Sequence, residues 1–436
     1  MRLLRRDAAG RAQRGGAGAV LAVVLAVGCS GGGRETLEQQ RGRALRQALA
    51  SISAESLRAH VEALASDDTD GRLPGSAGHR RARDYVIDAL SRAQVERGGV
   101  DGTSYLYLYP SEPHPRYLYP YPTGHDVVGL LLGSDPDHRE ESVVVMAHYD
   151  HLGRDSFQHV FNGAYDDVAG VATMLELARA LRASGYAPAR TVVWLITDEE
   201  ESGLRGARAF AKNPTVPRDG IVLGISLDPI GRGLVPGYAF TALFGLEHSP
   251  ALRERVEASR ARLGSHDVLI AHRDLIPHPP FASDHDPFLN EGFPAVWFVN
   301  PGFSFYHQIT DEPATIEYEV LLESVRVLAA LVDGVANDTE RYPFVESPPI
   351  AAADLAAFRT PIRGVLEALP DLGRSQRESL VGLDRRLAAI ESAGTYDPAE
   401  VDELGLAAMA QLFALGITNP GPIPPTFPAG ATAALP

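Results

Sequence analysis

The sequence of 436 residues contains very little cysteine and very little lysine. Its one cysteine, Cys29, excludes an intramolecular disulfide. Lysine occurs once, at Lys212. Lysine and arginine together number 40 against 56 acidic residues, which gives a formal net charge of −16. This shortage of positive charge argues against binding to nucleic acid, or to an anionic membrane surface, through the charge of the protein.

A long apolar run is missing at the N-terminus, where residues 17–27 are too few for a membrane-spanning helix. This short run follows five arginines in residues 1–16 and precedes Gly28-Cys29-Ser30. A basic segment, a short apolar run and small residues at a cleavage site predict an export signal. With cysteine directly after Gly28, residues 1–28 resemble a bacterial lipoprotein signal, which is cleaved before a lipid-modified cysteine.

We therefore expect an exported protein that is anchored to a membrane only through lipid on Cys29, on the periplasmic or cell-surface side. The alternative is a secreted protein, or one whose N-terminal segment is not cleaved.

The rest of the chain divides by composition and pattern. Residues 29–50 predict a polar tether that leads into a helix. In residues 51–338, apolar strands alternate with amphipathic helices, which predicts an α/β domain. Its mixed central sheet is expected to be mostly parallel, with helices on both faces. Residues 339–418 are rich in alanine and leucine at helical spacing and predict a small helical appendage. Residues 419–436, rich in proline and glycine, predict a disordered tail.

Residues 143–152, with the sequence VVVMAHYDHL, are the stretch around which the domain is organised. The five apolar residues predict a buried strand, and His148 follows directly. Ligand-binding groups of such sheets lie just beyond the carboxyl ends of the strands. Asp150, two residues further on, is placed to orient the His148 ring. The sequence assigns no role to the second histidine, His151.

Acidic residues and another histidine follow the other strands and loops of this half of the domain. They are Asp166 and Asp167 before a predicted helix, Asp198 to Glu201 after the strand at 190–197, Asp228 after the strand at 221–227, and His307 after the strand at 295–299. Each alone has an ordinary structural explanation, such as a solvated acidic run or a helix N-cap. Together they form a set of histidine and carboxylate ligands suited to zinc.

In this order the motifs resemble the cocatalytic zinc aminopeptidases of the aminopeptidase Y and bacterial leucyl aminopeptidase type. The resemblance covers about residues 55–338 and implies the fold of that zinc exopeptidase family. The matching motifs are Gly71–Ser76, Ala147–Gly153, Asn162–Asp167 with the helix at Met174–Arg179, Glu200–Gly206, Leu227–Gly231, Ser283–His285 and Tyr306–Asp311.

The resemblance implies two zinc ions and five ligands. These ligands are His148, Asp166, Glu201, Asp228 and His307. In the family's arrangement Asp166 bridges the ions, His148 and Asp228 complete the ligands of one ion, and Glu201 and His307 complete those of the other. Two metals about 3.5–4 Å apart activate one water and polarise the scissile carbonyl.

Two further residues match the family's catalytic positions. Glu200 matches the general base, which must stay free of metal to move the proton of the water. Asp150 matches the residue that orients His148. Because Glu199 adds a third acid, the register of this pair depends on the Gly203-Leu204 that follows. The sequence assigns no role to Asp284 or His285.

The resemblance implies a zinc-dependent exopeptidase that acts on peptide substrates, with an aminopeptidase as the leading hypothesis. One alternative is a glutaminyl cyclase-like acyltransferase, which uses one zinc on the same scaffold. Another is a carboxypeptidase or amidohydrolase of the same clan. A hypothesis of a different class is an inactive surface lipoprotein that binds peptides or metal. That hypothesis predicts erosion of the ligand or base positions, and all of them are present.

Overall fold

The structure is a computed structural model that describes residues 35–115, 121–259, 266–275 and 283–418. The predicted export signal, Cys29 and the predicted tail at 419–436 lie outside the described residues. Within the described part of the chain, no helix is both long enough and apolar enough to cross a membrane.

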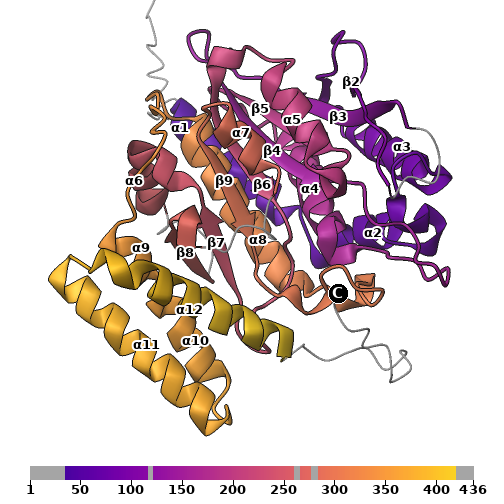
Figure 1. The fold of residues 1–436 in the computed structure, drawn as a ribbon. Coiled ribbons are helices and arrows are strands. Elements are labelled where there is room, and N and C mark those ends of the chain that lie inside the picture. The colour runs from indigo at the N-terminus through magenta and orange to yellow at the C-terminus, as the bar shows by residue number, and fades with distance from the viewer. Residues whose placement is uncertain (1–34, 116–120, 260–265, 276–282, 419–436) are drawn as a thin grey trace, which may run out of the picture.

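Among the described residues, a mixed sheet of nine strands lies at the centre of the fold (Figure 1). Its order is β1-β3-β5-β4-β6-β9-β7-β8, and β2 pairs with β3. The central strands β5, β4, β6 and β9 are parallel. Strand β3 runs antiparallel to its neighbours, and β7 runs antiparallel to β9 but parallel to β8. The strands are β1 Glu96–Arg97, β2 Leu106–Pro110, β3 Thr123–Leu131, β4 Ser142–His148, β5 Thr191–Thr197, β6 Ile221–Leu227, β7 Phe240–Phe244, β8 Asp267–Ala271 and β9 Ala295–Val299.

Helices cover both faces of this sheet, as the sequence predicts. On one face α4 and α8 pack on β4, with α1 and α2 beyond α4; on the other, α7 packs on β6 and β9, and α5 on α7 and β3. The helices before the C-terminal region are α1 Leu37–Ala50, α2 Ala54–Leu64, α3 Ala77–Arg92, α4 Ala169–Ala183, α5 Arg205–Lys212, α6 Pro250–Ser259, α7 His285–Asn290 and α8 Tyr318–Ala336.

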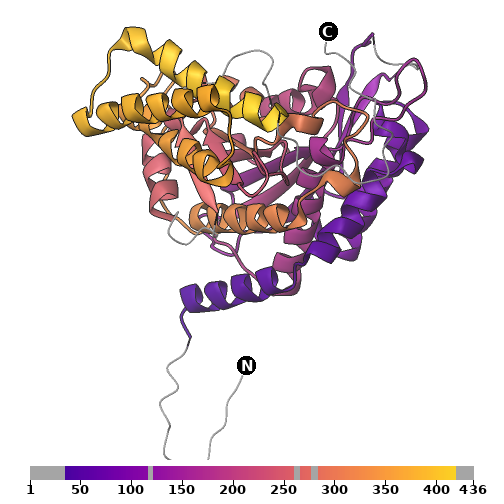
Figure 2. The ribbon, with the colours of Figure 1, turned by 90° about the horizontal axis from the view of Figure 1, so that it is seen from below.

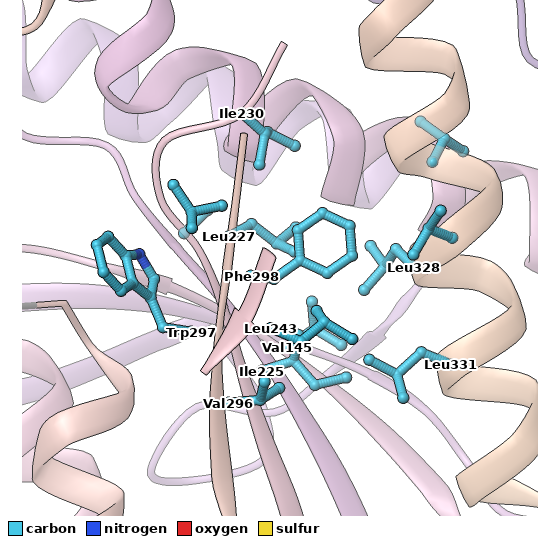
Figure 3. Packing of buried hydrophobic residues seen from close by; sticks show 14 of the residues in the cluster. Val145, Ile225, Leu227, Ile230, Leu243, Val296, Trp297, Phe298, Leu328 and Leu331 are labelled. Atoms are coloured by element: carbon cyan, nitrogen blue, oxygen red, sulfur yellow. The ribbon is translucent and has the colours of Figure 1, made fainter. Parts of the chain in front are cut away.

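Two apolar layers explain why the central strands lack polar alternation. Alternate residues of β4 point to opposite faces, so Val143 and Val145 join the core under α4 and α8, while Val144 and Met146 join the core under α5 and α7. Figure 3 shows the first of these layers, where residues of β4, β6 and β9 pack against Leu328 of α8. All seven residues of β4 are buried, so its last residue, His148, enters the site from a rigid position.

The predicted strands at 143–147, 190–197, 221–227 and 295–299 are confirmed within one or two residues. The sequence did not predict β7 and β8, which extend the sheet beyond β9. The predicted tether also needs correction, because Leu37–Ala50 forms helix α1 with Thr36 and Gln39 in a capping box. Ala44 and Ala48, four residues apart on one face, are buried as α1 packs on α4.

The C-terminal region is helical, as predicted, and packs beside the β7–β8 edge. Its helices are α9 Ala352–Ala357, α10 Arg359–Ala368, α11 Arg374–Ala393 and α12 Pro398–Thr418. Both α9 and α10 contact β8. Figure 2 shows α1 and these C-terminal helices on opposite sides of the molecule. The appendage thus shares the apolar core of the domain and covers the part of the sheet that the sequence did not predict.

Phe358 should make a large contribution to the stability of this appendage. Its side chain is fully buried in the shared core. Phe358→Ala should lower the free energy of unfolding by about 3–5 kcal/mol, through lost apolar burial and an unfilled cavity. Denaturant unfolding measures this change. Arg374→Ala is the control, since its side chain is 92% exposed, and should change stability by less than about 0.5 kcal/mol. Equal stability of Phe358→Ala and the unsubstituted protein would contradict this packing.

Candidate metal centre

Four strands and one helix start bring the predicted ligands together at one edge of the sheet. His148 ends β4, Asp228 directly follows β6, and Glu201 follows β5 by a short turn. His307 comes from the loop after β9, and Asp166 from the turn that leads into α4. Because β4, β5, β6 and β9 are parallel, their carboxyl ends meet at the same edge.

The Asp166 carboxylate lies between two groups of side chains. Its Oδ1 is 3.0 Å from Nε2 of His148, which in turn is 3.7 Å from Oδ1 of Asp228. Its Oδ2 is 3.1 Å from Nε2 of His307, which is also 3.1 Å from Oε1 of Glu201. Each oxygen of one carboxylate therefore belongs to a different cluster of donor atoms.

His151, to which the sequence assigned no role, lies in the second cluster. Its side chain is fully buried, with Nδ1 2.9 Å from Oε1 of Glu201 and 3.8 Å from Oδ2 of Asp166. Hydrophobic periodicity does not predict the direction of a side chain beyond the end of a strand. The sequence therefore could not show that the His151 ring points into the site. Only its position three residues after His148, in the same turn, hinted at the site.

Several of these buried atoms lie close together without hydrogen bonds between them, an arrangement that a bound metal ion would explain. Within the described residues, Oδ2 of Asp166, Oε1 of Glu201 and Nε2 of His307 have no hydrogen-bond partner with acceptable geometry. Buried polar atoms are nearly always paired, so such atoms within about 3 Å of each other need an explanation. Nitrogen and oxygen donors that face a common point match the ligands of zinc, which binds them at about 2.0–2.2 Å.

The charges of the two clusters are strongly coupled. Burial disfavours the protonated ring of His307, but the close carboxylates of Asp166 and Glu201 outweigh it and raise the pKa of His307 to about 10. Although burial and Asp166 act in the opposite direction, the two neighbouring histidines lower the pKa of Glu201 to about 2. Burial lowers the pKa of His151, which keeps this ring neutral near pH 7. Neutral imidazole and ionised carboxylate are the forms that bind metal.

Glu200 and its neighbour Glu199 have different surroundings from Glu201. Glu199 is fully buried, and its Oε1 accepts hydrogen bonds from Ser111 at 2.6 Å and from Arg205 at 3.0 Å. Burial is the main cause that raises the pKa of Glu200 well above its ordinary value, and nearby acidic side chains add to it. The arrangement gives Glu199 a structural role, whereas Glu200 is the acid of this pair with a raised pKa.

Asp150 contacts both parts of the predicted catalytic unit. Nδ1 of His148 lies 3.1 Å from the backbone carbonyl oxygen of Asp150 and 3.6 Å from its carboxylate. The same carboxylate accepts hydrogen bonds from the backbone N–H groups of Glu200 at 3.0 Å and Glu201 at 3.4 Å. Besides facing the His148 ring, it therefore fixes the turn that carries both glutamates.

Arg72 holds together the two loops that carry ligands. Its guanidinium is fully buried and donates to the carbonyl oxygens of Tyr149, Asn162 and Gly163 at 2.6–3.0 Å, and to that of Leu64. Burial lowers the pKa of Arg72 to about 10 and nearby carboxylates oppose the shift, so the side chain stays positively charged near pH 7. One buried cation thus joins the turn after β4 to the turn before α4.

Two other aspartates support the site from outside the clusters. The buried carboxylate of Asp311 accepts hydrogen bonds from the backbone N–H groups of Tyr165 at 2.9 Å and Asp166 at 3.1 Å. Asp284, without a role in the sequence, accepts a hydrogen bond from the Thr197 hydroxyl at the end of β5. Both fix the backbone from which the ligands extend.

Comparison with known proteins finds a family match for the central part of the chain. Residues 126–332 match the sequence model of the family described as Peptidase family M28. A relative named "Probable zinc metalloprotease" from Pyrenophora teres f. teres is 27% identical over 318 residues, covering 64% of this chain and 63% of the relative. In the first three curated relatives, the match spans between 43% and 63% of the relative's length.

Two solved structures share the fold. A leucine aminopeptidase precursor from Bacteroides thetaiotaomicron has a TM-score of 0.51 at 18% identity, covering 66% of this chain and 98% of that one. A glutaminyl cyclase from Porphyromonas gingivalis has a TM-score of 0.50 at 20% identity, covering 65% and 98%. The family match agrees with the resemblance seen in the motifs, and the two solved structures confirm the α/β fold.

Metal binding to this centre should release protons. The pKa of His307, raised to about 10, means that its ring is protonated near pH 7.5 in metal-free protein, and the pKa of His148 is raised as well. Both rings must be neutral to bind metal, so we expect release of at least about one proton and an affinity that falls as the pH is lowered. Calorimetric zinc titration in buffers of different ionisation enthalpy measures this number. Heats that are the same in every buffer would contradict the assigned protonation states.

Proposed function

We propose, from the match of residues 126–332 to the model of peptidase family M28, that this protein is an exopeptidase dependent on two zinc ions. Its most specific form is an aminopeptidase that hydrolyses the N-terminal bond of peptides. His148, Asp166 and Asp228 would hold one ion, and Asp166, Glu201 and His307 the other.

The position of Asp166 is the observation that supports this proposal most strongly. Its two carboxylate oxygens lie in different donor clusters, each with at least one histidine. A single-ion site has no need for this division. A bridging carboxylate lowers the repulsion between two cations about 3.5–4 Å apart, the separation at which two metals act on one substrate.

The side chains of the protein have separate tasks in this reaction. When bound, the zinc ions would supply Lewis acidity for the scissile carbonyl and a lowered pKa for the attacking water. Glu200 accepts the proton of that water and delivers it to the amine that leaves, a task favoured by its raised pKa. The carboxylate of Asp150 accepts a hydrogen bond from the backbone N–H of Glu200 and so positions Glu200.

The charge of the site favours a substrate with a free amine over one with a free carboxylate. In the described part of the chain, every ion pair of Asp150, Asp166, Glu201 and Asp228 is with a histidine. The nearby Arg72 is fully buried, and its N–H groups are used by backbone carbonyls. A carboxypeptidase needs a cation for the C-terminal carboxylate of its substrate. The site supplies acidic groups instead, which suit an ammonium group.

Glu200→Gln should separate catalysis from metal binding. We expect it to keep both zinc ions and to lower kcat for aminoacyl anilides by about 10²–10⁴-fold, because the amide cannot accept the proton. Kinetics together with metal analysis measure both effects. Glu378→Gln, a change of an exposed residue of α11, is the control and should behave like the unsubstituted protein. Loss of zinc from Glu200→Gln would assign the ligand role to Glu200 and contradict this register.

The same assay distinguishes the alternatives. An aminopeptidase cleaves aminoacyl anilides and loses this activity with a chelator, whereas N-acetylated substrates are poor. Release of ammonia from an N-terminal glutamine without peptide cleavage would identify glutaminyl cyclisation. Removal of C-terminal residues alone would identify a carboxypeptidase. Two bound zinc ions without turnover of any of these substrates would favour the binding lipoprotein.

We also propose that the protein is exported and anchored through lipid on Cys29, because residues 1–28 resemble a lipoprotein signal. In a bacterial host, Cys29→Ser should prevent lipid attachment and move the protein from the membrane fraction to the soluble fraction. Labelling with a radioactive fatty acid and cell fractionation measure this. Equal membrane association of both forms would contradict the anchor.

A further inference from the structure

The surroundings of the buried His151 ring are not explained by hydrogen bonding or by packing alone. The backbone N–H of His151 donates to the carbonyl oxygen of Arg72 at 3.3 Å, which fixes the residue in the turn after β4. A Cβ atom on Gly163 would lie 2.5 Å from Cδ2 of His151, so the lack of a side chain at Gly163 makes room for the ring. The ring is fully buried.

The Nδ1 atom of His151 completes a closed ring of four donor atoms. Nitrogen and oxygen alternate around these four donor atoms. Nδ1 of His151 is 2.9 Å from Oε1 of Glu201, and this Oε1 is 3.1 Å from Nε2 of His307. Nε2 of His307 is in turn 3.1 Å from Oδ2 of Asp166, and this Oδ2 is 3.8 Å from Nδ1 of His151. Donors bound tetrahedrally to zinc at 2.0–2.2 Å lie about 3.3–3.6 Å apart, and the four separations between neighbouring donor atoms here, 2.9–3.8 Å, lie around that range.

Hydrogen bonding does not account for these contacts. Within the described residues, neither nitrogen of His151 has a hydrogen-bond partner of acceptable geometry, and neither do the facing oxygens of Glu201 and Asp166. A buried histidine whose only role is packing normally donates to a well-oriented acceptor. Here Nδ1 approaches Oε1 of Glu201 closely without pointing at it, as happens when both atoms point at a third.

We propose that Nδ1 of His151 is a fourth protein ligand of the ion held by Asp166, Glu201 and His307. This inference rests on the proposed function, because it adds one residue to the second metal position of that centre. The two positions are then unequal. The position of His148, Asp166 and Asp228 would have three protein ligands and stay open. The other would have four, because His307 contacts Asp166 and Glu201 of the group that contains His151.

Unequal ligand numbers predict unequal ion binding. Zinc sites with four protein ligands are typically closed and structural, and those with three keep a position for water or substrate. The ion beside His151 is therefore the more tightly held, and the ion beside Asp228 exchanges first. Wild-type protein should lose its two ions in two separate steps as chelator is added.

The test compares full-length wild type with His151→Asn and His151→Ala. Asparagine keeps a polar atom near the position of Nδ1 but replaces the imidazole, and alanine removes the ligand entirely. Zinc affinity is measured by competition with a chromogenic chelator, and the ligand field by the visible absorption of the cobalt(II) form. His159→Ala is the matched control, because His159 is an exposed histidine that pairs with Asp155 in the loop following His151. Thermal unfolding of metal-free samples verifies folding.

We expect both His151 variants to weaken the tighter ion by about 10–100-fold or more and to leave the weaker ion unchanged. The cobalt(II) spectrum should change in energy and intensity, which a residue that only packs against the site would not cause. Wild-type affinities and spectrum in a folded His151→Asn or His151→Ala protein would overturn the inference while leaving the two-zinc centre intact. Failure of wild type to bind two zinc ions would instead overturn the proposed function and this inference with it.

Discussion

The repulsion among buried acidic groups is the constraint on which the rest of this structure depends. Asp166, Glu201 and Asp228 are gathered at one edge of the sheet, largely away from water. Ionised carboxylates in such a place are costly unless cations or hydrogen-bond donors compensate them. Histidines compensate the acids at the centre, where the proposed zinc ions would add positive charge, and the backbone N–H groups that bind Asp150 and Asp311 compensate the acids around it.

The fold places these groups by two kinds of rigid support. The parallel strands are buried on both faces and end at the same edge of the sheet, so side chains from distant parts of the chain lie close together there. The turns between them are fixed by buried polar contacts, above all those of Arg72, whose planar fork joins carbonyl oxygens from two ligand loops. Such preorganisation matters because metal ligands and a proton acceptor must keep their geometry throughout the reaction.

The sequence predicted the central strands and a gathering of histidines and carboxylates at their ends because continuous apolar runs and strand-end positions have clear physical signals. The choice of five ligands among them came from the family resemblance. The sequence did not predict β7 and β8, two short strands in the half of the sheet covered by the C-terminal helices. It also missed His151, Asp284 and the function of Arg72. Their roles depend on the direction of a side chain in an irregular turn, which follows from tertiary contacts and not from local spacing. The role of Asp150 as orienter of His148 stays a prediction, to which the structure adds its bonds to the glutamate turn.

The central claim is that Asp166 bridges two zinc ions. A crystal of zinc-loaded protein, with diffraction recorded on both sides of the zinc absorption edge, tests it most directly. We predict two anomalous peaks about 3.5–4 Å apart, one beside each carboxylate oxygen of Asp166. A single peak in fully loaded protein, or two peaks that do not share Asp166, would contradict this account.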